Sequence, residues 1–283
     1  MTVISDYSGF VGEVWSKKIN AALDKTCCML QCVNRDWQQD ADKGVSKINI
    51  ITPTTISASE YTGAISEYGT MSTTPTILEL SQKIYFGITV PDVAEVQSNV
   101  SILDTVVENA KKGIEQKIDS YLFGQYTSTD AENQLGSTEN AVEITKENIY
   151  AQFVALAKKL KISGAIDGSN PGWVVVHPDV EEVILLSDSF TKATDAADKA
   201  TREGAIGKIA GLDVFVSNNV GKNSDHYVVL AGTQKGITYA SQLAKIETLR
   251  AESSFNSIVR GLYMFGGMVV NPKAIATLTC TIG

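Results

Sequence analysis

The sequence predicts an α+β protein, because a long strand and a long helix in its first half precede alternating helices and strands. Apolar residues occupy alternate positions between residues 78 and 90, with Gln82 as the one exception, which is typical of a strand with one buried face. After Pro91 the apolar spacing changes to three and four residues, the period of an amphipathic helix. A helix over residues 92–123 would be roughly 45 Å long. Elements of this length suit an extended building block better than a compact enzyme.

Composition narrows the class of protein. The chain has 283 residues, 43% hydrophobic content and a net charge of -8, so it can bury a core and does not read as disordered. Its lysines and arginines are scattered, and no basic stripe marks it as a direct binder of nucleic acid. No apolar run of about 20 residues predicts a membrane span. Residues 1–24 lack the basic and apolar regions of a signal peptide.

The elements before the long strand begin with a helical pattern over residues 10–29 and a short strand marked by Ile48 and Ile50. Residues 52–75 are rich in Thr and Ser and contain no Leu, Val or Phe, so they cannot build a core. They read as a long loop or extended hairpin that leaves the body. Tyr61 and Tyr68 favour contact with a partner over the alternative, a mobile surface loop without a role.

The long helix has a start signal in Asp92, which can cap it, and a plausible end at Gly124. A polar stretch over residues 127–141 is a candidate boundary. Beyond it the pattern predicts a helix over 145–160, a buried strand over 173–177, a helix that begins at Pro178 and a polar loop over 187–203. The remaining predicted strands cover residues 212–217, 227–231, 246–252, 258–270 and 275–280.

The sequence contains no recognisable catalytic, cofactor-binding or metal-binding constellation. Residues 204–209 hold a Gly-Lys pair, but only two residues separate the glycines and Ile209 follows the lysine, so a turn is favoured over a phosphate-binding loop. His177 stands at the end of a strand, where a structural role is common. The cysteines read as small buried hydrophobic residues, and their spacing matches no zinc pattern: Cys27, Cys28, Cys32 and Cys280.

In their order along the chain, several segments resemble the major capsid proteins of tailed phages, with the Hong Kong 97 type fold. The resemblance covers most of the chain. The segments that carry it are residues 33–37 (VNRDW), 82–90 (QKIYFGITV), Asp92, 97–99 (QSN) and 204–219 (GAIGKIAGLDVFVSNN).

The resemblance implies a division of the chain into parts. Residues 1–36 would form an N-terminal arm, and 37–80 an extended loop with its flanking strands. Residues 81–138 and 262–283 would form a peripheral domain around the long spine helix, and 139–261 an α/β axial domain. Subunit-interface candidates are Tyr61, Tyr68, Trp37 and Trp15; Trp37 also reads as a packing anchor.

The function that the resemblance implies is self-assembly, as pentamers and hexamers, into the icosahedral shell of a phage that encloses double-stranded DNA. The implied partners are a portal protein and packaged DNA without sequence-specific binding, with no membrane, enzyme activity or cofactor. The chain starts almost at the arm, so scaffolding would come from a separate protein or from a segment already removed. The implied location is the virion capsid, and the host cytoplasm during assembly. The alternatives are an encapsulin-like nanocompartment and an α/β enzyme with an accessory domain.

Overall fold

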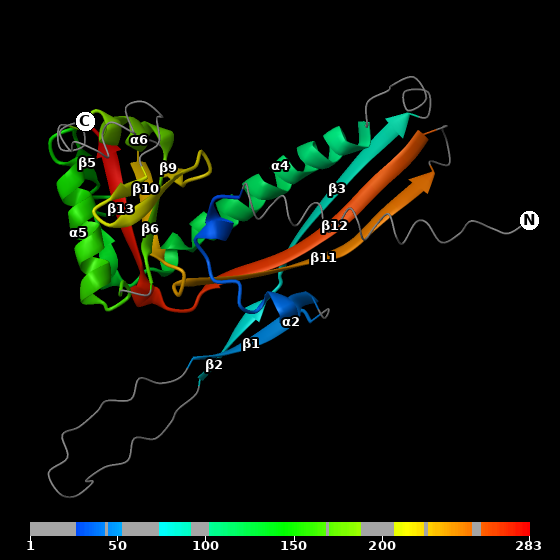
Figure 1. Ribbon diagram of the computed structural model, residues 1–283, viewed down its shortest axis with the longest axis horizontal. Coiled ribbons are helices and arrows are strands. Elements are labelled where there is room, and N and C mark those ends of the chain that lie inside the picture. The colour runs from blue at the N-terminus through cyan, green and yellow to red at the C-terminus, as the bar shows by residue number, and fades with distance from the viewer. Residues whose placement is uncertain are drawn as a thin grey trace, which may run out of the picture.

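The computed structural model describes residues 27–42, 45–52, 74–91, 102–167, 170–187, 207–223, 226–250 and 256–283. Figure 1 shows a body built around a broad sheet, an elongated layer of three strands beside a long helix, and a small hairpin. The predicted α+β class is confirmed.

The body is an eight-stranded sheet in the order β4-β13-β10-β6-β8-β7, with β5 beside β13 and β9 beside β10. Its strands are β4 (Gln134–Leu135), β5 (Val142–Ile144), β6 (Gly172–Val176), β7 (Lys208–Ile209), β8 (Leu212–Val216), β9 (Lys222–Asn223), β10 (His226–Thr233) and β13 (Ile275–Ile282). Two helices, α5 (Ile149–Ile162) and α6 (Pro178–Leu185), pack on one face of it. The predicted strand–helix–strand order of this half and the start at Pro178 are confirmed.

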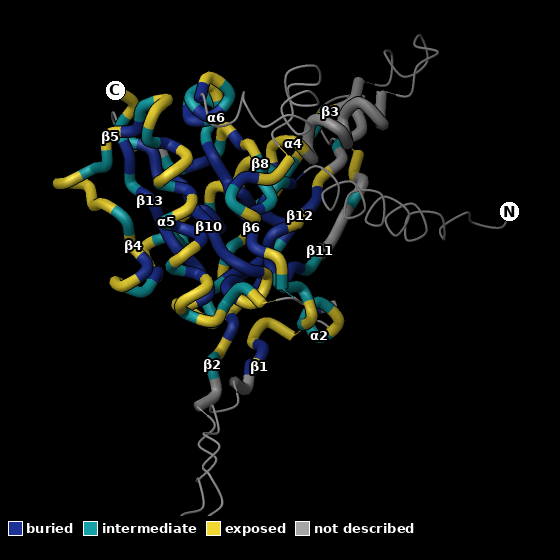
Figure 2. The backbone as a smooth tube through the Cα atoms, turned by 60° about the vertical axis from the view of Figure 1, so that its left-hand side comes forward, coloured by how far each residue is buried: buried dark blue, intermediate teal, exposed yellow. Residues whose placement is uncertain are grey.

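Both faces of this sheet are covered, as the buried course of β13, β10 and β6 in Figure 2 shows. Successive residues of β6 alternate between two cores because side chains of a strand point to opposite faces. Val174 and Val176 join Phe153 of α5 in one core. Trp173 and Val175 join the other core, which contains the end of the helix α4 (Ile102–Phe123) and the N-terminal segment, residues 27–33. Every residue of β6 is therefore buried.

The elongated layer is an antiparallel sheet in the order β11-β12-β3, formed by β3 (Gln82–Pro91), β11 (Ile237–Arg250) and β12 (Asn256–Val269). The long helix α4 (Ile102–Phe123) runs beside it in Figure 1. Ile114 and Ile118 of α4 are buried, as the helical spacing predicts. The Tyr121 ring packs nearly perpendicular to that of Phe265 in β12, with ring centroids 5.4 Å apart. The start of β11 was not foreseen, because only residues 246–252 alternate visibly.

The single long strand predicted for residues 76–90 is wrong, because two strands with different partners share that stretch. β2 (Thr74–Glu79) pairs with β1 (Lys47–Thr52) in a hairpin of its own, while β3 pairs with β12. The chain changes sheets at Leu80 and Ser81, where Glu79 lies against Gly266 of β12 so closely that a Cβ on the glycine would stand 2.1 Å from the Glu79 carbonyl oxygen. The alternation itself is confirmed: Leu78 and Leu80 are buried and Tyr85 is exposed.

The helix predicted over residues 92–123 is present from Ile102 to Phe123, and residues 92–101 lie outside the described ranges. Its described length is roughly 33 Å for 22 residues. The α-helix ends before Gly124, as predicted, but the chain continues as the 3-10 turn η2 (Gly124–Ser128) instead of turning left-handed.

Strand pairing divides the molecule differently from the expected boundaries. The expected grouping joins residues 262–283 with the long helix, yet β13 pairs with β10, β4 and β5 inside the eight-stranded sheet. Conversely β11, expected in the axial domain, pairs along its length with β12 in the elongated layer. The names peripheral and axial for these two parts stay predictions.

Candidate functional site

The three-stranded sheet has one covered face and one open face. On the covered face Tyr239, Tyr263 and Phe265 are fully or nearly fully buried beside α4. On the open face Tyr85 of β3 is 84% exposed, and Leu262 of β12, directly opposite it in the register, is 36% exposed. An antiparallel sheet with one solvated face normally carries polar side chains there, so large apolar residues in this position mark a candidate contact surface.

The open face has a shallow hollow of about 500 Å³ beside an ion pair. The register aligns Glu247, Arg260 and Gly87 across the three strands. The guanidinium of Arg260 donates two hydrogen bonds to one Glu247 carboxylate oxygen, at 2.6 and 2.9 Å. An exposed pair of this kind adds little stability, but it fixes two long side chains in the lining of the hollow that Tyr85 also lines. The surface formed by Tyr85, Glu247, Leu249, Ile258, Arg260 and Leu262 is called the open-face patch below.

Sequence reasoning missed the open-face patch, although one signal pointed to it. Tyr85 occupies an odd position, on the face of β3 that Lys83 and Thr89 share and that the alternation assigns to solvent. A large aromatic residue on a face that otherwise carries polar side chains indicates a candidate contact surface. The other half of the patch lies about 160 to 180 residues further along the chain, so only strand pairing reveals it.

Trp37, a predicted interface candidate, lies at the base of the hairpin. It is partly buried and packs against a cluster that joins the hairpin to β11 and includes Ile48, Leu78 and Ala240. The adjoining helix α2 (Gln38–Asp42) is tied to β11 because Gln38 donates to the carbonyl of Ser241 at 2.6 Å and accepts its N–H at 3.1 Å. These contacts agree with the packing role, and an interface role for Trp37 stays a prediction. Tyr61, Tyr68 and Trp15 lie outside the described residues.

Asp119 of α4 is a buried attachment point for the segment that leads into the body. It is only 2% exposed, and one carboxylate oxygen accepts the Met29 N–H at 3.1 Å and the Cys27 thiol at 2.9 Å. Asn34 continues the attachment, because it exchanges backbone hydrogen bonds with Ile237 and Tyr239 of β11. The sequence alone offered no partner for Asp119.

The cysteines behave as predicted, as free and largely buried thiols. Burial, followed by the nearby Asp119 carboxylate, raises the pKa of Cys28 to about 12, and burial raises the pKa of Cys280 to about 12. The pKa of Cys27 is raised for the same reasons as that of Cys28. These thiols therefore stay protonated and are poor nucleophiles near neutral pH.

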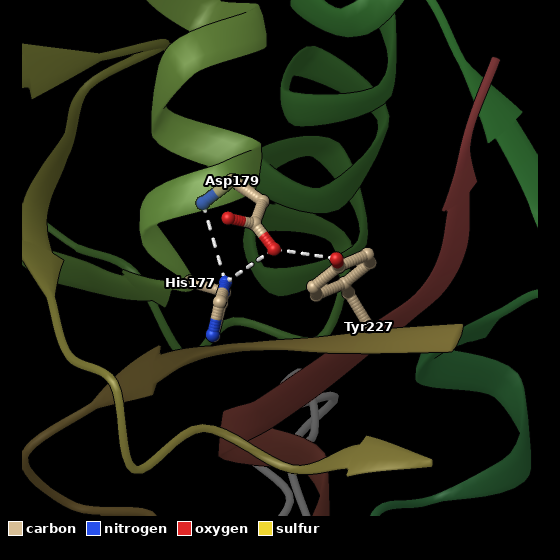
Figure 3. Close-up of polar contacts among 3 residues, drawn as sticks. All are labelled: His177, Asp179 and Tyr227. Carbon is tan, nitrogen blue, oxygen red and sulfur yellow. Dashed lines mark hydrogen bonds and ion pairs between the residues drawn. The ribbon is translucent and has the colours of Figure 1, made fainter. Parts of the chain in front are cut away.

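Three polar side chains at the start of α6 form a cluster of a His, an Asp and a Tyr, residue types that also occur in catalytic sites. Figure 3 shows them. The His177 Nδ1 lies 3.2 Å from the Asp179 N–H and 3.2 Å from its Oδ2, and the Tyr227 hydroxyl donates to that oxygen at 2.5 Å. These contacts cap the helix and pin it to β10. His177 thus has the structural role predicted for it, and the cluster contains no Ser, Thr or Cys nucleophile.

Within the described parts of the chain, no group of three or more His, Cys, Asp and Glu side chains is placed to hold a metal ion. The helices of those parts are also too short or too polar to cross a bilayer. The candidate functional features among the described residues are therefore surfaces, namely the open-face patch and the hairpin.

Comparison with known proteins agrees with this view. The family model described as phage capsid protein matches residues 76–278. A structure from Mycobacterium phage Che8 has a TM-score of 0.70 at 22% identity, over 87% of this chain and 88% of the other. The capsid of Ralstonia phage GP4 has a TM-score of 0.65 at 10% identity, over 83% of each chain. The capsid of a native GTA particle has a TM-score of 0.65 at 12% identity, over 91% of each. No curated protein sequence matches.

Proposed function

The chain belongs to the phage capsid protein family, and we propose that copies of it associate as pentamers and hexamers of the icosahedral shell of a tailed bacteriophage. The observation that carries the proposal is the family match over residues 76–278, which spans α4, both large sheets and the open-face patch. The role is structural rather than catalytic. It agrees with the described residues, whose exposed apolar side chains form surface patches.

The elongated layer suits a shell tile for a physical reason. A shell joins many identical subunits through contacts that are individually weak, and their free energies add because each subunit makes several at once. The open-face patch offers exposed apolar area, and β1 and β2 of the hairpin stand apart from the eight-stranded sheet (Figure 1). We propose that neighbouring copies of the chain pack against these surfaces.

The charge of the chain supports enclosure of DNA without tight binding. A wall with net charge -8 gains little from phosphate contacts, so packaged DNA is free to move along it. We propose a portal protein as a further partner, scaffolding by a separate protein or by a segment already removed, the virion capsid as the final location and the host cytoplasm as the place of assembly.

Electron microscopy and sedimentation of the purified chain test the proposal together with the open-face patch. The wild type is expected to form capsomers or shells. A Tyr85→Ser, Leu262→Ser double variant is expected to stay folded, to lose no more than about 2 kcal/mol of unfolding free energy because the two side chains are 84% and 36% exposed, and to assemble less. Lys117→Ser is the control, because Lys117 is exposed on α4, which packs on the opposite face of the three-stranded sheet.

A wild-type chain that stays monomeric at high concentration, with and without a scaffolding partner, would contradict the shell function. Normal assembly of the double variant would instead contradict only the role of the open-face patch. DNA inside purified particles, as opposed to an enclosed enzyme, separates a phage shell from an encapsulin-like compartment.

A further inference from the structure

Helix α5 has a second flank that carries exposed apolar side chains. Its buried side packs on the sheet through Phe153, Leu156 and Leu160. On another side Tyr150, Val154 and Ile162 are 41%, 42% and 75% exposed. This flank borders a hollow of about 530 Å³ lined by Tyr150, Val154, Ala157, Lys158, Lys161, Ile162 and Ala210. The solvent side of a helix on a soluble body is normally polar, so this α5 hollow has the composition of a contact surface.

The turn between β7 and β8 borders the hollow and places a small apolar residue, Ala210, in a strained left-handed conformation. Ala210 and Gly211 join β7 to β8 with φ values of 52° and 88°, the left-handed conformation that a type I′ hairpin turn requires. Asn, Asp or Gly normally fills the first of these positions, because a Cβ makes the conformation costly. Ala210 accepts that cost, and its methyl group lines the hollow.

The rim of the hollow is basic on a chain that is acidic overall. Lys158 and Lys161 are exposed, and neither forms an ion pair with any residue in the ranges that the structure describes. The whole chain carries a net charge of -8. Two unpaired positive charges beside exposed apolar side chains favour a partner surface that is acidic.

The same chain carries such a surface at the far edge of the same sheet. The hollow includes the turn between β7 and β8 at one edge, whereas β4 and β5 form the opposite edge beside β13. Glu139 and Glu143 are exposed there. In a closed ring of identical subunits, each contact joins one side of a subunit to a different side of the next. Charges of opposite sign on opposite edges are what such a ring needs.

We propose that the α5 hollow receives the β4–β5 edge of a second copy, with Lys158 and Lys161 facing Glu139 and Glu143 across the contact between neighbours in a capsomer ring. The proposal rests on the shell-forming function proposed above and assigns to it a side-to-side contact. This contact is separate from the open-face patch, which lies on the three-stranded sheet.

Charge reversal and rescue test this contact with the full-length chain. A Lys158→Glu, Lys161→Glu variant is expected to raise the concentration needed for capsomer formation at least about tenfold. The reverse change on the other edge, Glu139→Lys with Glu143→Lys, is expected to have a similar effect. Combining all four substitutions restores assembly, because the attraction returns with its signs exchanged. Sedimentation velocity measures assembly, and thermal unfolding checks each variant.

The control variant is Lys112→Glu with Lys117→Glu, which reverses two exposed lysines on α4 and is expected to assemble like the wild type. If the Lys158 and Lys161 variant assembles normally, the α5 hollow does not meet a second copy and the inference is wrong. If both edge variants fail and the fourfold variant does not recover, the two edges are not partners and the inference is again wrong. A wild type that never assembles would overturn the proposed function itself.

Discussion

The two large sheets of this protein differ in how fully the chain covers them. The eight-stranded sheet has α5 and α6 on one face and the N-terminal segment with the end of α4 on the other. Among the described residues, the three-stranded sheet has α4 on one face, and Tyr85 and Leu262 stand exposed on the other. Figure 2 shows the same contrast between the buried strands of the body and the mixed burial of the elongated layer.

This difference separates what the subunit needs for folding from what it has available for association. Apolar area buried inside the chain stabilises the monomer at roughly 25 cal/mol per Å². Apolar area left exposed contributes nothing to the monomer and becomes useful only when another surface covers it. The eight-stranded sheet therefore buries apolar area on both faces within the chain, whereas the three-stranded sheet keeps exposed apolar side chains for neighbours.

The strongest test of this contrast compares one aromatic truncation in each sheet region. Phe153→Ala removes a fully buried ring from the core between α5 and the eight-stranded sheet, and is expected to lower the unfolding free energy by about 3–5 kcal/mol. Tyr85→Ala on the open face is expected to cost less than about 1 kcal/mol. Urea denaturation measures both. Equal losses would show that the open face is covered within the monomer.

An intermediate effect is expected where the hairpin meets the elongated layer. Gly266→Ala places a Cβ 2.1 Å from the Glu79 carbonyl oxygen, so the backbone must move at an expected cost of about 1–3 kcal/mol. Gly87→Ala in the neighbouring strand is the matched control, because a Cβ there meets no atom within 4 Å. If chemical denaturation finds the two variants equally stable, the change of sheets at Leu80 and Ser81 is not packed on β12.

The smallest expected effect is the alkaline sensitivity of the body. The folded-state pKa of Cys280 is about 12, above its ordinary value of 9.0, because burial disfavours the thiolate. Its contribution to stability is complete below pH 9 and is lost between about pH 9 and 12, as the unfolded chain releases the proton first. Cys280→Ala should therefore lose less stability than the wild type between pH 8 and 10. Parallel curves from pH-dependent denaturation would contradict this.

Local patterns predicted much of the fold. The alternation of Ile48 with Ile50 and of Leu78 with Leu80 marks buried faces because a strand repeats every two residues. Pro178 marks the start of α6 because its fixed φ suits the first turn and its missing N–H costs nothing there. The buried cysteines and the structural role of His177 belong to the same group, although only the structure shows that His177 caps α6. These features depend on residues that are neighbours in the chain.

The candidate surfaces could not be found this way, because they join distant segments. Tyr85 lies opposite Leu262 only through the pairing of β3 with β12, and Tyr150 and Ala210 line the same hollow only after α5 packs on the sheet. The predicted interface residues Tyr61, Tyr68 and Trp15 lie outside the described residues, so they stay predictions. Asp119 was missed because its partners, Cys27 and Met29, are about 90 residues away.

By itself the sequence determined the α+β class, the helix that ends at Phe123, the helix–strand alternation of the second half and the resemblance to phage capsid proteins. Periodicity and end signals are local properties that the chain carries before it folds. Only the tertiary structure decided that the strand breaks at Leu80 and Ser81, that β13 joins the body and that one face of the three-stranded sheet stays open. Those outcomes depend on which distant segments pair, because a side chain becomes buried only when another segment packs against it.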